Sequence, residues 1–138
     1  MRRLAILLLI SLVLGGRAEA QAQAPAPPAT PAAPADPDPP YMSQLLRLAE
    51  ILGAVHFLQT LCGTAADRSA WREEMAALLD SENPNPDRKA RLVASFNRGY
   101  RGFSETYRTC TDSARTSIER YRAEGAKISR EIVARYGG

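Results

Sequence analysis

Residues 90–110, ARLVASFNRGYRGFSETYRTC, decide the fold class. Read as an α-helix of ~3.6 residues per turn, the stretch divides into three faces. One face is apolar and aromatic: Leu92, Val93, Phe96, Tyr100, Phe103, Tyr107 and Cys110. A second face carries arginine: Arg91, Arg98, Arg101 and Arg108. A third holds small residues: Ser95, Gly99, Gly102 and Thr106. A helix with these faces is predicted to be central to what the domain packs against and binds.

The rest of the folded sequence also has helical periodicity, and no stretch alternates with the two-residue period of a β-strand. Helices are expected over 43–61, 68–79, 86–110 and 113–136. Their expected N-terminal caps are Ser43, Asp67, Asn85 followed by Pro86, and Thr111 or Asp112. The first helix is apolar on nearly all sides, which favours a central position over an outer face kept for a partner. The predicted fold is a small all-α, four-helix up-down bundle.

Cys62 and Cys110 are the two cysteines of the chain. In an oxidising compartment, two cysteines in a small domain indicate one disulfide. If unstrained, a bond closing this loop would stabilise the fold by about 4 kcal/mol. The topology supports the pairing, because the first and third helices of an up-down bundle run in the same direction and the cysteines stand at their C-terminal ends.

The first 20 residues have the pattern of a secretory signal peptide. Two arginines precede the apolar run 4–14, and residues 18–20 form an A-x-A cleavage site. The apolar run is shorter than the ~20 residues of a membrane-spanning helix, so no stable span is expected after cleavage. Residues 21–40 hold eight of the ten prolines and are predicted to be a disordered Pro/Ala-rich linker. Residues 41–138 are the expected helical domain.

The formal net charge of +3 falls to +1 after removal of the signal peptide, because 15 basic and 14 acidic residues remain. An exported, nearly neutral chain is not expected to bind nucleic acid. Arginine outnumbers lysine thirteen to two in the expected domain, and arginine suits carboxylates and phosphates. The arginine face is either a surface for an acidic protein, peptidoglycan carboxylates or lipid headgroups, or a solvated face paired with glutamates of the fourth helix. The second alternative is favoured.

Gly99 and Gly102 each destabilise a helix by ~1 kcal/mol relative to alanine, so they require a structural reason. Close packing of another helix on the small-residue face is favoured, with Gly125 of the fourth helix as its counterpart. The alternative is a kink that opens an aromatic pocket between the first and third helices. That pocket would be lined by Tyr100, Phe103 and Tyr107.

The sequence has no motif of a catalytic, metal or cofactor site. His56 is the one histidine, and six helical positions place it on a different side from Cys62, so a Cys–His pair is not expected. One histidine and two distant cysteines are also too few for zinc. No metal and no cofactor are predicted, and the chain is not expected to be an enzyme. A hydrolase of the cell envelope is the least favoured alternative.

Three runs resemble a known family: LRLAEILGAVHFLQTLCG at 46–63, FNRGYRGF at 96–103 and TYRTC at 106–110. This family comprises small exported alphaproteobacterial proteins with no assigned function. Each has a signal peptide, a spacer and a two-cysteine helical domain. The resemblance implies the limits of the domain and a periplasmic location, and it implies no activity and no residue roles.

We therefore expect a non-catalytic binding or adaptor module of the cell envelope, with an envelope protein or peptidoglycan as its partner and the oligomeric state left open. The expected contact residues are Asn97, Arg98, Tyr100, Arg101 and Arg108. The alternative is a binder of a small ligand or a peptidoglycan fragment that uses the aromatic pocket.

Overall fold

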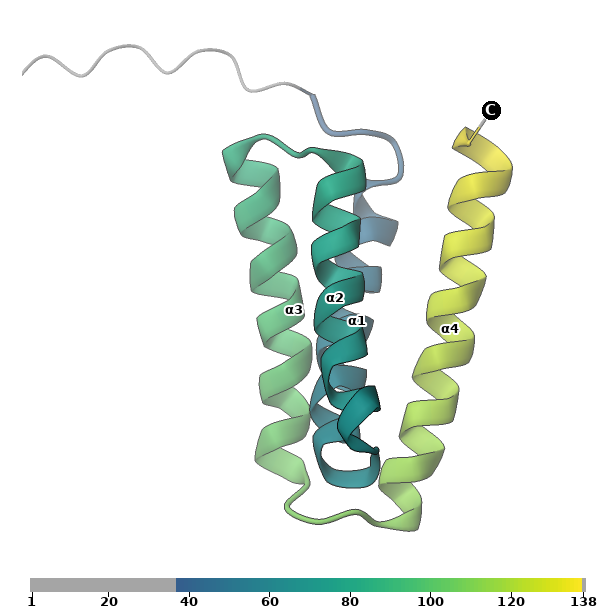
Figure 1. Ribbon diagram of the computed structural model, residues 1–138. Coiled ribbons are helices and arrows are strands. Elements are labelled where there is room, and N and C mark those ends of the chain that lie inside the picture. Colours follow the sequence, from purple (N-terminus) through teal and green to yellow (C-terminus); the bar gives the residue numbers. More distant parts are fainter. Residues whose placement is uncertain (1–36, 138) are drawn as a thin grey trace, which may run out of the picture. The chain divides into compact units, whose positions relative to one another are not determined.

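Every regular element of the described protein is an α-helix. The computed structural model describes residues 37–137, without the side chains of Ala65 and Ala66. The helices are α1 (Met42–Cys62), α2 (Ala65–Glu82), α3 (Pro86–Thr106) and α4 (Asp112–Tyr136), which run alternately up and down (Figure 1). The all-α four-helix bundle predicted from the sequence is confirmed. The predicted signal peptide and residues 21–36 of the predicted linker lie outside the described residues.

A capping box starts α2 earlier than predicted. The Oγ1 atom of Thr64 accepts a hydrogen bond from the backbone N–H of Asp67, and the Asp67 carboxylate accepts one from the N–H of Thr64. This reciprocal pair satisfies two N–H groups that a helix start otherwise leaves unpaired. Asp67 is therefore the third residue of α2, and Thr64 is its cap.

The predicted caps of α3 and α4 are confirmed. Asn85 accepts a hydrogen bond from the N–H of Arg88 at 2.9 Å, directly before the proline that opens α3. Thr111 accepts a hydrogen bond from the N–H of Ala114 at 3.1 Å and caps α4. Side-chain oxygens at these positions hold the first turns in place.

The predicted cap of α1 is wrong. Ser43 lies inside the first turn, and the N-cap is Tyr41, whose side chain makes no capping hydrogen bond. The chain enters α1 through a turn in which the N–H of Met42 donates to the carbonyl of Pro39 at 2.9 Å. This backbone bond satisfies one of the N–H groups that the first turn of a helix otherwise leaves unpaired.

α3 ends four residues before its predicted end. A disulfide ties the loop that follows it to the end of α1. Tyr107 is extended, with φ −110° and ψ 132°, so residue 110 lies in the loop rather than on the helix. A disulfide joins Cys110 to Cys62 at the end of α1, with 5.0 Å between the Cα atoms. The predicted disulfide and the common direction of α1 and α3 are both confirmed.

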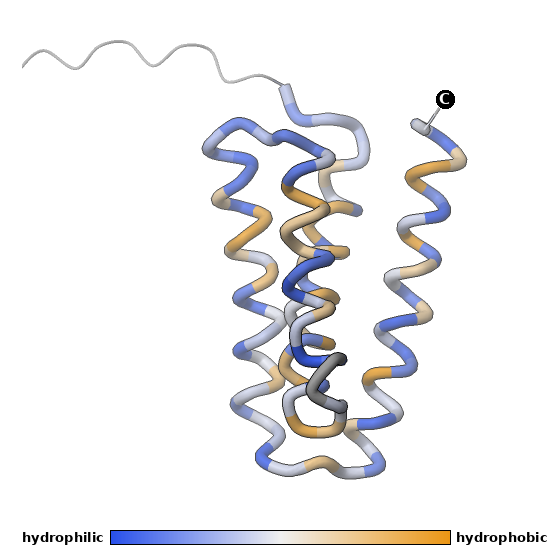
Figure 2. Tube along the Cα trace, in the orientation of Figure 1, coloured by the Kyte–Doolittle hydropathy of each residue, from blue (hydrophilic) through white to orange (hydrophobic). Residues whose placement is uncertain are grey.

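α1 is the core helix of the bundle. It packs against each of the other three helices, which make few contacts with one another. Residues 51–59 are buried without interruption, as expected of a helix covered on all sides. The outer helices alternate between hydrophilic and hydrophobic segments along their length, as helices with one buried side do (Figure 2). Among residues 37–137, α1 is the one helix with the length and composition of a membrane span, and most of it is buried inside the bundle.

α1 and α3 approach each other backbone to backbone through two glycines. A Cβ atom added at Gly99 would lie 1.9 Å from the carbonyl oxygen of Glu50, and one added at Gly53 would lie 1.9 Å from that of Phe96. The prediction that Gly125 packs against the small-residue face of α3 is wrong. Gly125 packs on α1 instead, where a Cβ atom would lie 3.3 Å from the side chain of Ile51.

Candidate functional site: a groove between α2 and α4

The five predicted contact residues of the arginine helix do not share one surface. Arg101 and Arg108 are exposed, and neither side chain forms an ion pair within residues 37–137. Tyr100 instead points into the bundle, where its ring meets that of Phe57 edge-on at 5.3 Å between centroids. Asn97 is half-buried. What remains of the predicted surface is a pair of free arginines.

A chain of ion pairs ties α3 and α4 to α1. Arg98 lies 3.5 Å from Glu50 and donates a hydrogen bond to Ser95 at 3.1 Å. Glu50 lies 3.5 Å from Arg47 of the same helix, and Arg47 donates to both carboxylate oxygens of Glu124 on α4, at 2.7 and 3.0 Å. These two hydrogen bonds lower the pKa of the Glu124 carboxyl below its ordinary value. Arg98 is thus linked to α4 only through α1.

The predicted pairing of the α3 arginines with glutamates of α4 is therefore wrong. The cause is the geometry of the bundle, in which α3 and α4 both pack on α1 and make few contacts with each other. Arg91, the remaining arginine of this face, pairs with Asp38 in the segment before α1.

The small-residue face of α3 divides into a buried half and an exposed half. Ser95 and Gly99 are buried against α1, as predicted. Gly102 and Thr106 are exposed, and a Cβ atom added at Gly102 would meet nothing within 4 Å. The prediction is wrong for these two, because Gly102 is turned about 60° from Gly99 around the helix axis and Thr106 is the last residue of α3. Val93, predicted on the apolar face, is also exposed.

His56 is a buried core residue. Its ring lies 5.8 Å from that of Phe96 and 5.7 Å from that of Tyr100, measured between centroids. Burial, followed by the positive charge of Arg72, lowers the pKa of the imidazole. Cys62, which is not expected to pair with His56, forms the disulfide with Cys110. Within residues 37–137, no group of three or more His, Cys, Asp or Glu side chains is placed to hold a metal ion.

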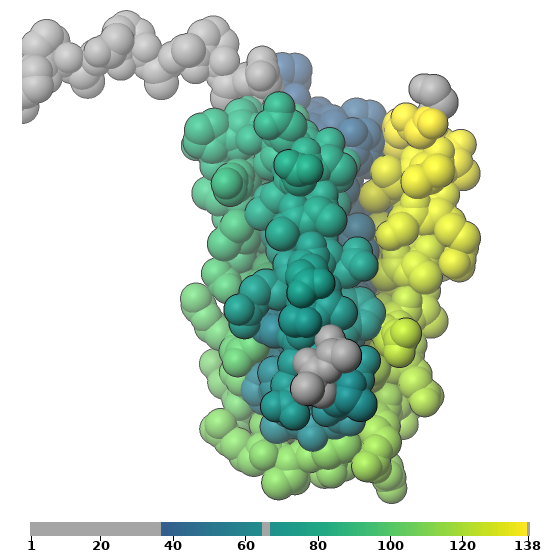
Figure 3. Space-filling model, viewed as in Figure 1, coloured from purple at the N-terminus to yellow at the C-terminus, as the bar shows by residue number. Residues whose placement is uncertain are grey.

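A groove with a cavity volume of about 760 Å³ lies between α2 and α4. Its floor comes from α1 and consists of the apolar Leu48, Ile51 and Leu52, with the polar Gln59 at the end where Asp67 lies. The two walls are the sides of α2 and α4, which border the groove on the face shown in Figure 3. The groove exists because α2 and α4 both pack on α1 without closing on each other.

Small side chains line both walls of the groove. On α2 they are Ala70, Ala77 and Ser81, and on α4 they are Gly125, Ala126 and Ser129. Both serine hydroxyls donate to carbonyls of their own helices, at 3.1 Å for Ser81 and 3.0 Å for Ser129. These hydroxyls have their hydrogen-bonding protons engaged, so the walls present mainly apolar atoms to the groove.

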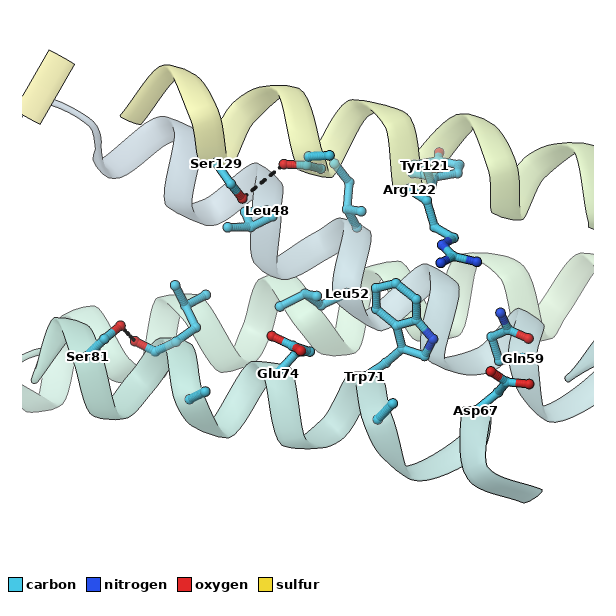
Figure 4. Close-up of a pocket in the computed structure, with 16 residues that line it drawn as sticks. Leu48, Leu52, Gln59, Asp67, Trp71, Glu74, Ser81, Tyr121, Arg122 and Ser129 are labelled. Carbon is cyan, nitrogen blue, oxygen red and sulfur yellow. Dashed lines mark hydrogen bonds between the residues drawn. The ribbon is translucent and has the colours of Figure 1, made fainter. Parts of the chain in front are cut away.

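The polar groups of the groove stand at its edges. Arg122 reaches from α4 toward α2, with its guanidinium 5.6 Å from the centroid of the Trp71 ring (Figure 4). Asp67 lies at the same end of the groove, and hydrogen bonds from Thr64, aided by the charge of Arg122, lower the pKa of its carboxyl. Glu74 points from α2 into the space between the helices (Figure 4) and forms no ion pair within residues 37–137. The groove therefore has an apolar floor, one acidic wall and an arginine at one end.

Comparison with known families shows which family the chain belongs to. Residues 40–136 match the family described as "Protein of unknown function (DUF2385)". The protein belongs to this family. No curated protein and no solved structure matches the chain.

The family match spans all four helices and both cysteines, so the groove lies within the DUF2385 domain. It agrees with the resemblance seen in the sequence as far as an uncharacterised family is concerned.

The sequence did not predict this groove, and the alternative that it offered to close packing was an aromatic pocket between the first and third helices. Those two helices touch through Gly53 and Gly99, and the cavity described above lies on another side of α1. One signal was present in the sequence. Ala70, Glu74, Ala77 and Ser81 recur at helical spacing on one side of α2, which is the pattern of a flank without large apolar side chains.

Proposed function

We propose that this DUF2385 protein is a non-catalytic binding or adaptor module of the cell envelope, and that its groove between α2 and α4 binds a helical segment of protein. The observation that carries the proposal is the open groove itself, with an apolar floor and small residues on both walls. Recognition of an amphipathic helix in an apolar groove is a recurring mode of protein binding.

The dimensions of the groove suit a helix. On α2 the lining runs from Asp67 to Ser81, which corresponds to a length of about 21 Å at ~1.5 Å per helical residue. Side chains of one or two heavy atoms on the walls let the backbone of another helix approach closely. The unpaired carboxylate of Glu74 suits a basic residue on the edge of such a helix.

Two features support a periplasmic location. The first 20 residues have the pattern of a signal peptide, and the folded domain carries a disulfide between Cys62 and Cys110.

A second candidate function is the binding of a small ligand or a peptidoglycan fragment. The volume of about 760 Å³ lies within the range of small-molecule sites, and two aromatic rings, Trp71 and Tyr121, line the groove.

Photo-crosslinking in whole cells tests the proposal. Ala77 lines the groove and Ala76 does not, yet both are exposed alanines of the same helix. A benzoylphenylalanine in place of Ala77 is expected to form a protein adduct that is lost when Ala126→Arg obstructs the opposite wall. The same group in place of Ala76 is the matched control and is expected to form no such adduct.

Identical adducts from both positions, or an adduct at position 77 that persists with Ala126→Arg, would contradict binding in the groove. An adduct with the mass of a small molecule would favour the second candidate.

A further inference from the structure

The α2 wall and the α4 wall of the groove are complementary in charge, and this complementarity indicates which partner covers the groove. Resting on the proposed function of the groove, we infer that the helices that cover it are α2 and α4 of a second copy of this chain. In the resulting symmetric dimer, each copy's α2 lies against the other copy's α4.

The direction of the helices permits this arrangement. α2 and α4 run in the same direction, because the chain reverses its direction between α2 and α3 and again between α3 and α4 (Figure 1). A half turn about an axis that runs parallel to the helices along the open side of the groove therefore brings α2 opposite the partner's α4 and α4 opposite the partner's α2. Such a two-fold interface uses the same surface on both copies.

The charges on the two walls have opposite signs. The charged residues of α2 that line the groove are both carboxylates, Asp67 and Glu74. The corresponding side of α4 carries three arginines, Arg115, Arg122 and Arg130, and two acids, Asp112 and Glu119, of which Asp112 pairs with Arg115. Placing α2 against a second α4 therefore puts carboxylates opposite guanidinium groups, whereas α2 against α2 would put like charges together.

The charged residues of the two walls also lie at comparable positions along the helix axes. The contact of Arg122 with Trp71 marks one level on both walls. Glu74 is three residues further along α2, or ~4.5 Å, and Arg130 is eight residues beyond Arg122, or ~12 Å. A rotation axis parallel to the helices leaves these levels unchanged. Glu74 then faces the stretch of the second α4 between the partner's Arg122 and the partner's Arg130.

Apolar surface on the same sides would be covered by the second copy. Val133 has 66% of its surface exposed and follows Ala126 and Ser129 at helical spacing on the groove side of α4. Ala70 and Ala77 are exposed on the facing side of α2. Removing these groups from water favours association, and their small size lets the helices of the two copies pack closely.

A second copy explains both walls at once. An unrelated partner would have to supply a basic helix for α2 and an acidic helix for α4 at the same separation, whereas symmetry supplies both from the same chain.

Sedimentation of the purified, oxidised protein tests the inference. Over about a hundredfold range of concentration, the wild-type mass is expected to rise to that of two copies, because assembly follows mass action. Ala77→Arg and Ala126→Arg are expected to weaken the dimer at least about tenfold, equal to ~1.4 kcal/mol. The matched control of the α2 variant, Ala76→Arg, adds the same charge to an exposed site of α2 outside the groove and is expected to leave the dimer unchanged.

A charge exchange tests the pairing of α2 with α4 directly. Glu74→Arg and Arg130→Glu are each expected to weaken the dimer, and the double variant is expected to recover part of the loss. A wild-type protein that stays monomeric throughout, or a control variant that weakens the dimer as much as the groove variants, would overturn the inference. If the protein is monomeric and the adduct at position 77 is still lost with Ala126→Arg, only the second copy is refuted. If that adduct is also absent, the proposed function fails with it.

Discussion

At the scale of single residues, the two glycines of α3 show how one pattern in the sequence covers two physical situations. Gly99 is required because the backbone of α1 lies where its side chain would be, while Gly102 faces open space. Both glycines stand out in the sequence for the same reason, their cost in a helix. The partner glycine, Gly53, could be predicted only with knowledge of which side of α1 meets α3.

Substitution by alanine distinguishes the two glycines. Gly99→Ala is expected to lower the free energy of unfolding by about 1–3 kcal/mol or more, because its Cβ atom would overlap the carbonyl of Glu50 and push the helices apart. Gly102→Ala is expected to be neutral or to raise it by up to ~1 kcal/mol through better helix propensity. Urea unfolding of both variants measures the difference, and equal effects would argue against the close contact of α1 with α3.

At the scale of elements, the bundle depends on how each outer helix is attached to α1. α3 is attached through glycines and through the disulfide in the loop that follows it. α4 is attached through the buried Ala114 and Ile118, through Gly125 and through the paired Arg47 and Glu124. The number and order of the helices, the caps of α3 and α4, the disulfide and the central position of α1 could all be predicted from the sequence. Each of them follows from local periodicity, capping chemistry or the pairing of two cysteines.

The groove could not be predicted in this way. It depends on the separation of two helices that make few contacts with each other, and no local pattern specifies a distance between helices. The arginine face failed as a predicted surface for a related reason. Whether Arg98 is free or paired depends on Glu50 of another helix.

The pairing of Glu124 makes the attachment of α4 sensitive to pH. Its pKa is lowered in the folded protein, so the stabilisation is complete above the ordinary value of 4.5 and is lost as the pH falls through the folded value. Glu124→Gln is expected to cost about 1 kcal/mol or less near neutral pH, since the pair is partly exposed, and less than that at about pH 3. Urea unfolding at the two pH values tests this, with Glu119→Gln, an exposed site on α4, as the control. A cost that is the same at both pH values would contradict the role of the charge.

At the scale of the whole domain, a central helix with three neighbours leaves one approach to its surface open. α1 is covered by α3 on one side and by α2 and α4 on others, and the groove is the space that these two leave between them. A helix, or the paired helices of a second copy, would complete the shell around α1. The groove is thus both a consequence of the fold and the feature that gives the domain a binding surface.

Occupation of the groove is reported most directly by Trp71, which lines it and is the one tryptophan of the chain. Quenching of its fluorescence by acrylamide should be weaker in the wild type and in Ala76→Arg than in Ala77→Arg, because an occupant shields the ring in the first two proteins and is excluded from the third. Equal quenching in all three proteins, at concentrations where the wild type sediments as two copies, would contradict binding in the groove.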